Sequence, residues 1–354
     1  MDRAAPGWLE WFTGLPQWAL LVITGIGVAL LARGADWLVD GASGIAYRFG
    51  FSKVIVGATI VSLGTTSPEC AVSVMAAWSG EPGLALGNAI GSIIADTGLI
   101  FGLGCLIAVL PADRFILVRQ GWVQFGSAVL LALLAYGAWV VSGSSAVLGR
   151  TVGFLLLALL VGYMYLSVRW SREHPGPRPT IAAASGEAGG RTSPAAARLA
   201  GLLVVGLALV ILASRVVIVS VIELAEHHWH VPKVVIAATL VALGTSIPEM
   251  VIGLTSILKG HRELLVGNII GADVLNVLFV VGASAAAAPL PIFDAGASIP
   301  GIALWVHIPT MLVVLIYFRF IISSAARTGN FRRRQGLPLV ILYVIYVVLQ
   351  YAVA

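Results

Sequence analysis

Long apolar runs fill almost the whole chain, and polar residues gather in the short breaks between them. An apolar run of about 20 residues is long enough to cross the hydrocarbon core of a bilayer as a helix. The pattern therefore predicts an all-α polytopic membrane protein with ten transmembrane helices. The predicted spans are residues 17–46, 53–78, 83–110, 115–141, 145–169, 197–225, 232–258, 263–288, 297–320 and 335–353.

The predicted spans form two groups of five around one substantial polar break. Residues 170–196 are rich in Arg, Gly, Pro, Ser and Ala, a composition typical of a flexible linker. We therefore divide the chain into a first five-helix repeat (1–169), a linker (170–196) and a second five-helix repeat (197–354). Because five is odd, the second unit should enter the membrane from the opposite side, which makes the pair an inverted repeat.

Composition supports a membrane protein. Hydrophobic residues make up 59% of the chain and charged residues 10%, whereas a soluble domain carries roughly 25% charge. The net charge of +5 is dispersed along the chain, so the lipid bilayer is the expected partner and nucleic acid is not. The two cysteines, Cys70 and Cys105, lie in apolar stretches and are expected to be buried thiols. Neither a cofactor nor an obligate protein partner is indicated.

The distribution of Lys and Arg predicts the orientation. With the N-terminus outside, 16 of the 21 basic residues fall in the linker or near the inner ends of spans. Positive charge accumulates on the cytoplasmic side of membrane proteins. We therefore predict a multi-pass protein of the inner (plasma) membrane, with both termini outside and the linker in the cytoplasm.

One sequence pattern occurs twice at an offset of 180 positions. Each copy places a proline and a glutamate inside an apolar run, where an ionisable residue is costly, roughly 2.5–3.5 kcal/mol for Asp, Lys or Arg at a helix centre. A feature this unfavourable, present twice, indicates an ion pathway. The matching segments are Gly64-Thr-Thr-Ser-Pro-Glu69 with Gly244-Thr-Ser-Ile-Pro-Glu249, and Gly87-Asn-Ala-Ile-Gly91 with Gly267-Asn-Ile-Ile-Gly271.

Helical spacing places the polar residues of each copy on single helix faces. All the side-chain ligands that these faces offer are carboxylate, hydroxyl or amide oxygens, which suit Ca²⁺ and Na⁺ better than soft metals. The first copy presents Ser62, Thr65, Thr66 and Glu69 on one span and Asn88, Ser92 and Asp96 on the next. The second presents Ala242, Thr245, Ser246 and Glu249, followed by Asn268, Ala272 and Asn276.

The repeated prolines are expected to interrupt their helices. Pro68 and Pro248 have no N–H for the carbonyl groups of Gly64 and Gly244. A free carbonyl at membrane depth is tolerated where it lines a cavity or meets a partner. A desolvated cation is such a partner.

At these residues the chain resembles the cation/calcium exchanger superfamily, specifically the prokaryotic type of its sodium/calcium exchanger branch. The paired motifs of that family read G-T-S-x-P-E and G-N-x-x-G-S-N, and the corresponding regions here are 57–104 and 237–284. The resemblance implies exchange of Ca²⁺ against Na⁺ by alternating access at a shared midplane site. It implies that Glu69 and Glu249 are the central Ca²⁺ ligands. Further ligands implied are Thr65, Thr66, Thr245, Ser246 and Ser92, with backbone oxygens from Ser62 and Ala242.

Five positions depart from the family pattern, and the first is Ile93, which replaces the last Asn of the G-S-N segment. Ala272 lacks the hydroxyl that the family supplies to a Na⁺ site. Asp96 and Asn276 reverse the usual order of amide and carboxylate, and Asp273 is an additional acid. We retain Asp96 and Asn276 as ligands and add Asp273, Asn88 and Asn268 as further candidates. These departures leave the coupling ion open between Na⁺, H⁺ and K⁺.

Other classes of protein fit less well, and an enzyme is not expected. A cation channel needs a continuous oligomeric pore, which two inverted acidic repeats in one chain do not suggest. An intramembrane aspartyl protease using Asp96 and Asp273 would require a G-x-G-D motif, which is absent. His227, His228 and His230 are expected to form a solvated cluster at the outer surface, with zinc or proton sensing as the alternative.

Overall fold

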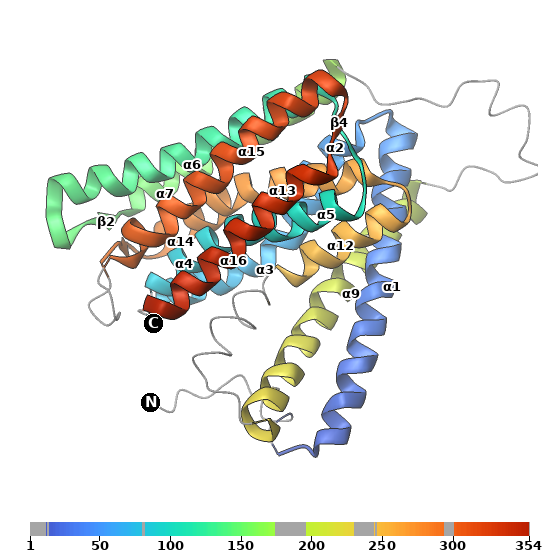
Figure 1. Cartoon of the computed structure of the whole chain (residues 1–354), viewed down its shortest axis with the longest axis horizontal. Coiled ribbons are helices and arrows are strands. Elements are labelled where there is room, and N and C mark those ends of the chain that lie inside the picture. Colours follow the sequence, from blue (N-terminus) through green and yellow to red (C-terminus); the bar gives the residue numbers. More distant parts are fainter. Residues whose placement is uncertain are drawn as a thin grey trace, which may run out of the picture.

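The structure is a computed structural model that describes residues 12, 14–79, 82–173, 196–229, 244, 246–293 and 301–353. Almost all of this part of the chain is helical (Figure 1). Within it, eight helices are long and apolar enough to cross a membrane: Gln17–Phe49, Lys53–Trp78, Pro82–Ile107, Arg114–Ser145, Arg150–Glu173, Ala196–Glu223, Arg262–Ala287 and Ala303–Thr328.

These eight helices coincide with eight of the predicted spans, with ends that agree or differ by up to eight residues. The ninth span shifts most, from the predicted 297–320 to Ala303–Thr328. Two further helices, α12 (Ile247–Leu258) and α16 (Gly336–Val353), lie within the remaining two predicted spans. The linker prediction falls mostly on residues 174–195, which lie outside the described part of the chain.

Several spans consist of more than one helical segment. The first half contains α1 (Gln17–Phe49), α2 (Lys53–Val56), η1 (Gly57–Val61), α3 (Ser62–Trp78), α4 (Pro82–Ile94), η2 (Ala95–Phe101), α5 (Gly102–Ile107), β1 (Leu110–Pro111), α6 (Arg114–Ser142), η3 (Gly143–Ser145), β2 (Val147–Leu148) and α7 (Arg150–Glu173). The second half contains α9 (Ala196–Glu223), η4 (Leu224–His228), α12, α13 (Arg262–Leu275), η6 (Asn276–Val281), α14 (Gly282–Ala287), β3 (Leu290–Pro291), η7 (Ala303–His307), α15 (Ile308–Thr328), β4 (Asn330–Phe331), η8 (Arg333–Gln335) and α16.

Contacts between the two halves occur twice, with each half taking the role of the other. Strand β1 pairs antiparallel with β4, and β2 pairs antiparallel with β3, near opposite ends of the bundle (Figure 1). In the same way, Gly153 at the start of α7 packs against the backbone of α14, while Gly336 at the start of α16 packs against the backbone of α5. Exchanging the two halves reproduces both sets of contacts, as a two-fold axis between them would.

Helices α1 and α9 pack side by side and lie at one edge of the bundle (Figure 1). Their backbones touch at glycines. A Cβ atom placed on Gly41 would lie 2.6 Å from the backbone nitrogen of Leu203, and one on Gly206 would lie 2.5 Å from that of Leu38. Small residues that allow such close approach are typical of helix interfaces in membranes.

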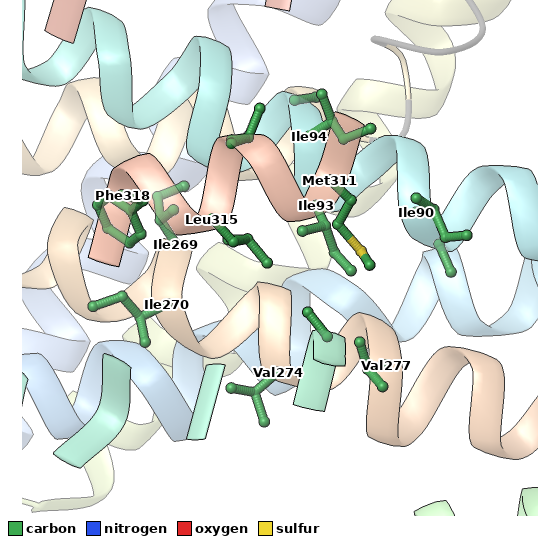
Figure 2. Close-up of a cluster of buried hydrophobic side chains, with 14 of the residues drawn as sticks. Ile90, Ile93, Ile94, Ile269, Ile270, Val274, Val277, Met311, Leu315 and Phe318 are labelled. Carbon is green, nitrogen blue, oxygen red and sulfur yellow. The ribbon is translucent and has the colours of Figure 1, made fainter. Parts of the chain in front are cut away.

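The centre of the bundle is built around α13, because the span that contains it, Arg262–Ala287, is almost completely buried. Figure 2 shows the apolar faces of α4, α13 and α15 meeting there. With these faces in the core, the polar positions of α4 and α13 are directed to other neighbours. The labelled core residues are Ile90, Ile93, Ile94, Ile269, Ile270, Val274, Val277, Met311, Leu315 and Phe318.

Candidate functional site

The two polar stripes predicted for the first repeat face one another. Glu69 on α3 and Ser92 on α4 are each 1% exposed, and the Ser92 hydroxyl donates a hydrogen bond of 2.8 Å to Glu69 Oε1. Ser62, Thr65 and Thr66 are fully buried on the same helix as Glu69. The Thr65 hydroxyl donates to the backbone oxygen of Ser62 at 3.2 Å. These side chains thus form a buried, oxygen-rich face of α3.

The second repeat brings its carboxylate to the same place. Glu249 lies in the first turn of α12 and is fully buried. The Asp96 carboxylate is repelled most strongly by Glu249, less by Glu69 and least by Asp273. The four acids therefore share one electrostatic environment. The Ser246 hydroxyl approaches Asp96 from the other half of the chain. Predicted ligands Thr245 and Ala242 lie outside the described residues.

We call this set the acidic site. Its described members are Ser62, Thr65, Thr66, Glu69, Ser92, Asp96, Ser246, Glu249 and Asn276.

Many polar atoms of the acidic site lack protein partners. Within the described part of the chain, both carboxylate oxygens of Asp96 and of Glu249 lack a hydrogen bond of regular geometry, although the Ser246 and Thr65 hydroxyls approach these two acids, and the amide atoms of Asn276 have no partner. Buried polar groups are normally paired, and an unpaired buried charge is costly. An array of unpaired, buried oxygens suits a hard cation, since Ca²⁺ takes 6–8 oxygen ligands.

The acidic site differs from a resident metal centre. Among the described residues, no three His, Cys, Asp or Glu side chains converge closely enough to hold a metal ion by themselves. A cation here would also need the hydroxyl and amide oxygens on the neighbouring turns. Ligands drawn from several helices suit an ion that is bound and released.

Two segments of π-helix occupy equivalent positions next to the acidic site. Segment η2 begins at Ala95 and η6 begins at Asn276, so Asp96 and Asn276 both fall in the first turn of a π-helix. Such wide turns occur frequently at functional sites. Both residues are fully buried. The reversed carboxylate and amide of this chain therefore occupy matching places in the two halves.

The predicted interruption at Pro68 is wrong. Helix α3 runs without a break from Ser62 to Trp78 with Pro68 inside it, and the irregular turn η1 lies immediately before. A proline removes one hydrogen bond, but its fixed φ is compatible with a helix, and membrane helices tolerate it. In the second repeat, α12 begins at Ile247 with Pro248 in its first turn, where a missing N–H costs little.

The glycines of the G-N-x-x-G segment in the second repeat allow two spans to cross closely. A Cβ atom on Gly271 would lie 2.5 Å from the Ser62 hydroxyl oxygen, and Gly267 packs against the backbone of Val54. The equivalent Gly87 meets no atom of the described residues within 4 Å.

The three further candidates have different surroundings. Asn88 donates from Nδ2 to the Ser73 hydroxyl at 3.0 Å. The amide atoms of Asn268 are buried without a partner among the described residues. Asp273 accepts hydrogen bonds from Thr97 at 2.5 Å and from Gln124 at 2.6 Å. Thr97 and Gln124 were missed from the sequence, although Gln120 and Gln124, one turn apart in an apolar span, are a signal that could have found them.

The predicted histidine cluster is only partly described. His227 Nδ1 lies 3.2 Å from Glu223 Oε1, and His228 Nε2 lies 3.0 Å from the backbone oxygen of Leu15. His230 is outside the described residues. The two described rings thus interact with separate partners.

A helical membrane bundle that buries acids from both of its halves, two of them (Asp96 and Glu249) without a hydrogen-bond partner among the described residues, is typical of the class of membrane cation transporters. A family model described as "Sodium/calcium exchanger protein" matches residues 19–169 and 198–352. These ranges cover most of the chain and both halves, so the chain belongs to the sodium/calcium exchanger family.

Similar proteins match nearly the whole chain. "Putative antiporter CaxA" of Alkalimonas amylolytica is 32% identical over 326 residues, which is 92% of this chain and 96% of the relative. "Sodium/calcium exchanger MaX1" of Methanosarcina acetivorans is 26% identical over 346 residues, 91% of this chain and 96% of the relative. A solved structure of the sodium-calcium exchanger NCX_Mj, soaked with Na⁺ and Sr²⁺, has the same fold, with a TM-score of 0.75 and 24% identity over 94% of this chain and 99% of that one.

Proposed function

We propose that this protein is a secondary active antiporter that exchanges Ca²⁺ against Na⁺ by alternating access at the acidic site. The observation that carries the proposal is the burial of Glu69, Asp96 and Glu249, which come from both halves of the chain and repel one another electrostatically. Membership of the exchanger family and the name of MaX1 support the same pair of ions.

Charge balance explains why the two ions would compete for the acidic site. Glu69 and Glu249 together carry two negative charges, which one Ca²⁺ neutralises. Na⁺ ions can neutralise the same carboxylates by binding between them and the neighbouring hydroxyls, such as those of Thr66 and Ser92. Because buried charge is costly when uncompensated, an empty site would resist crossing between access states, and each ion would leave only when another replaces it.

The arrangement of the chain supplies a route for alternating access. We take residues 1–169 and 197–354 as inverted five-helix repeats joined by a cytoplasmic linker, 170–196, with ten helices crossing the inner membrane. Helices α1 and α9 would slide as a pair over the other eight, and the glycine contacts between them support their moving as one unit. Both termini then lie outside. Impermeant thiol labelling of Ser193→Cys in intact cells would contradict this orientation.

Coupling to H⁺ or K⁺ is the alternative within the same mechanism. Ala272 is fully buried and offers no hydroxyl at the place where the family resemblance implies a Na⁺ ligand. Asp96 supplies a carboxylate at a position where an amide is usual. Both changes bear on which monovalent ion is exchanged, and neither removes the two glutamates that would hold Ca²⁺.

The test is the loss of one carboxylate at a time. Glu69→Gln and Glu249→Gln keep the size of the side chain but remove its charge, so each should abolish Ca²⁺ uptake into proteoliposomes while the protein remains folded. Glu173→Gln is the matched control, because Glu173 is exposed and pairs with Arg169 at 2.8 Å. Uptake near that of the wild type in either Glu69→Gln or Glu249→Gln would refute the acidic site.

A further inference from the structure

Asp273 is a buried acid that has no counterpart in the first half of the chain. It is 1% exposed on α13, and the residue 180 positions earlier is the buried, apolar Ile93. The repeated ligand set therefore does not include this position. A carboxylate added to one half alone needs its own explanation.

The partners of Asp273 are neutral. Its Oδ2 accepts the Thr97 hydroxyl at 2.5 Å and the Gln124 amide at 2.6 Å. Oδ1 has no hydrogen-bond partner in the described part of the chain, and no ion pair joins Asp273 to a described Lys, Arg or His. Two donors orient the carboxylate but do not cancel its charge, and a buried charge without compensation is strongly unfavourable.

A second open oxygen lies on α6, one turn before Gln124, which donates a hydrogen bond to Asp273. Gln120 precedes Gln124 by four residues, so both lie on one face of α6, which packs against α13. Gln120 is fully buried, and its Nε2 donates to the Ser167 hydroxyl on α7 at 3.1 Å. Its Oε1 has no partner among the described residues. The amide is thus oriented by Ser167 while its oxygen remains available.

The ion in the acidic site cannot compensate Asp273 as well. Glu69 and Glu249 already match the charge of one Ca²⁺, and Asp273 adds to the repulsion on Asp96. A further positive charge near Asp273 would relieve that repulsion. The open atoms are hard oxygens, which prefer hard metal cations.

We propose that Asp273, Gln120, Thr97 and Gln124 form an accessory site for one monovalent metal cation, Na⁺ or K⁺, separate from the acidic site. Asp273 Oδ1 and Gln120 Oε1 supply the charge and the open oxygens, while the Thr97 and Gln124 donors hold the carboxylate. The accessory site remains filled while Ca²⁺ occupies the acidic site. This proposal rests on the proposed function, since it presumes that Ca²⁺ is the ion at the acidic site.

The test is equilibrium binding of radiolabelled Na⁺, and of Rb⁺ as a probe for K⁺, to the purified full-length protein under saturating Ca²⁺. The wild type should retain one bound monovalent cation per chain, and the preferred probe identifies the ion. Asp273→Asn should lose this cation and Gln120→Leu should weaken its binding. Ser127→Ala is the control on the same helix, because the Ser127 hydroxyl bonds only the backbone oxygen of Gln124 in the described structure.

Two results would overturn the accessory site. They are an absence of monovalent cation binding under saturating Ca²⁺ and unchanged binding in Asp273→Asn. Should Asp273→Asn fail to fold, Gln120→Leu decides alone. Ca²⁺ binding measured in the same samples separates the two proposals, because it depends on Glu69 and Glu249 and should survive in Gln120→Leu.

Discussion

Lys259 provides the sharpest test of how α1 moves. It lies on the turn between α12 and α13, and its Nζ reaches across to α1, 2.7 Å from Asp40 Oδ1 and 3.5 Å from Asp36 Oδ1. It also donates to the backbone oxygen of Asp36 at 3.0 Å. These contacts connect α1, which we propose moves, with a turn that stays fixed in the bundle. Lys259→Gln should therefore release α1 from its position in this structure.

The expected size of the effect depends on exposure. The side chains of Lys259 and Asp40 are 27% and 51% exposed, so water screens their attraction. Pairs of this kind contribute about 0.2–1 kcal/mol. Taking about 1 kcal/mol for the pair with its additional bond to Asp36, the balance between access states should shift about fivefold. High salt should shift the wild type in the same direction.

The assay is distance measurement between spin labels at Phe49 and Leu258, which are exposed ends of α1 and α12, in a background without Cys70 and Cys105. Lys259→Gln and Asp40→Asn should each populate a second distance. The exchanged pair, Lys259→Asp with Asp40→Lys, should restore much of the original distribution. If both single variants keep the wild-type distances at low salt, the contact does not hold α1 and its proposed role is refuted.

Two further predictions concern packing and pH. Gly41→Val should lower the melting temperature, because a Cβ atom there would lie 2.6 Å from the α9 backbone and overpacking costs about 1–3 kcal/mol; Gly25→Val is the control on α1, since no described atom lies within 4 Å of a Cβ at Gly25, and equal melting temperatures would contradict the close contact. Burial, followed by Lys53 Nζ at 2.9 Å from Nδ1, lowers the pKa of His261 below its usual 6.5. The unfolded chain then binds the proton more readily than the folded protein, so stability is complete above about pH 6.5 and falls as the pH drops toward the lowered value. His261→Asn should flatten that part of the melting profile; an unchanged slope would show that another group is responsible.

The polar faces of the acidic site could be predicted because two patterns, the helical spacing and the repeat of 180 positions, mark the same residues there. Helical spacing placed Thr66 and Glu69 on one side of a span, and the offset of 180 positions marked the same side in the other half. The membrane spans could be predicted from the apolar runs, since a span requires only sufficient length and apolar composition. Features that depend on local pattern and repetition can therefore be predicted from one sequence.

The surroundings of Asp273 were not accessible in the same way. Thr97 and Gln124 come from different helices and take no part in the repeat, so only the packing of α13 brings them together. The hydrogen bond from Asn88 Nδ2 to Ser73 shows the same limit, because it joins two helices and no local spacing predicts it. The continuity of α3 through Pro68 also depends on its neighbours, which a local rule for proline does not include.

The most direct test of the proposed exchange is Ca²⁺ uptake by proteoliposomes that contain the wild-type protein and an ion gradient of known composition. Vesicles loaded with Na⁺ and diluted into Na⁺-free medium should take up radiolabelled Ca²⁺, whereas vesicles loaded with choline should not. Equal uptake in both would indicate a channel and contradict exchange. Uptake driven only by an outward K⁺ gradient or by a pH gradient would contradict Na⁺ as the coupling ion.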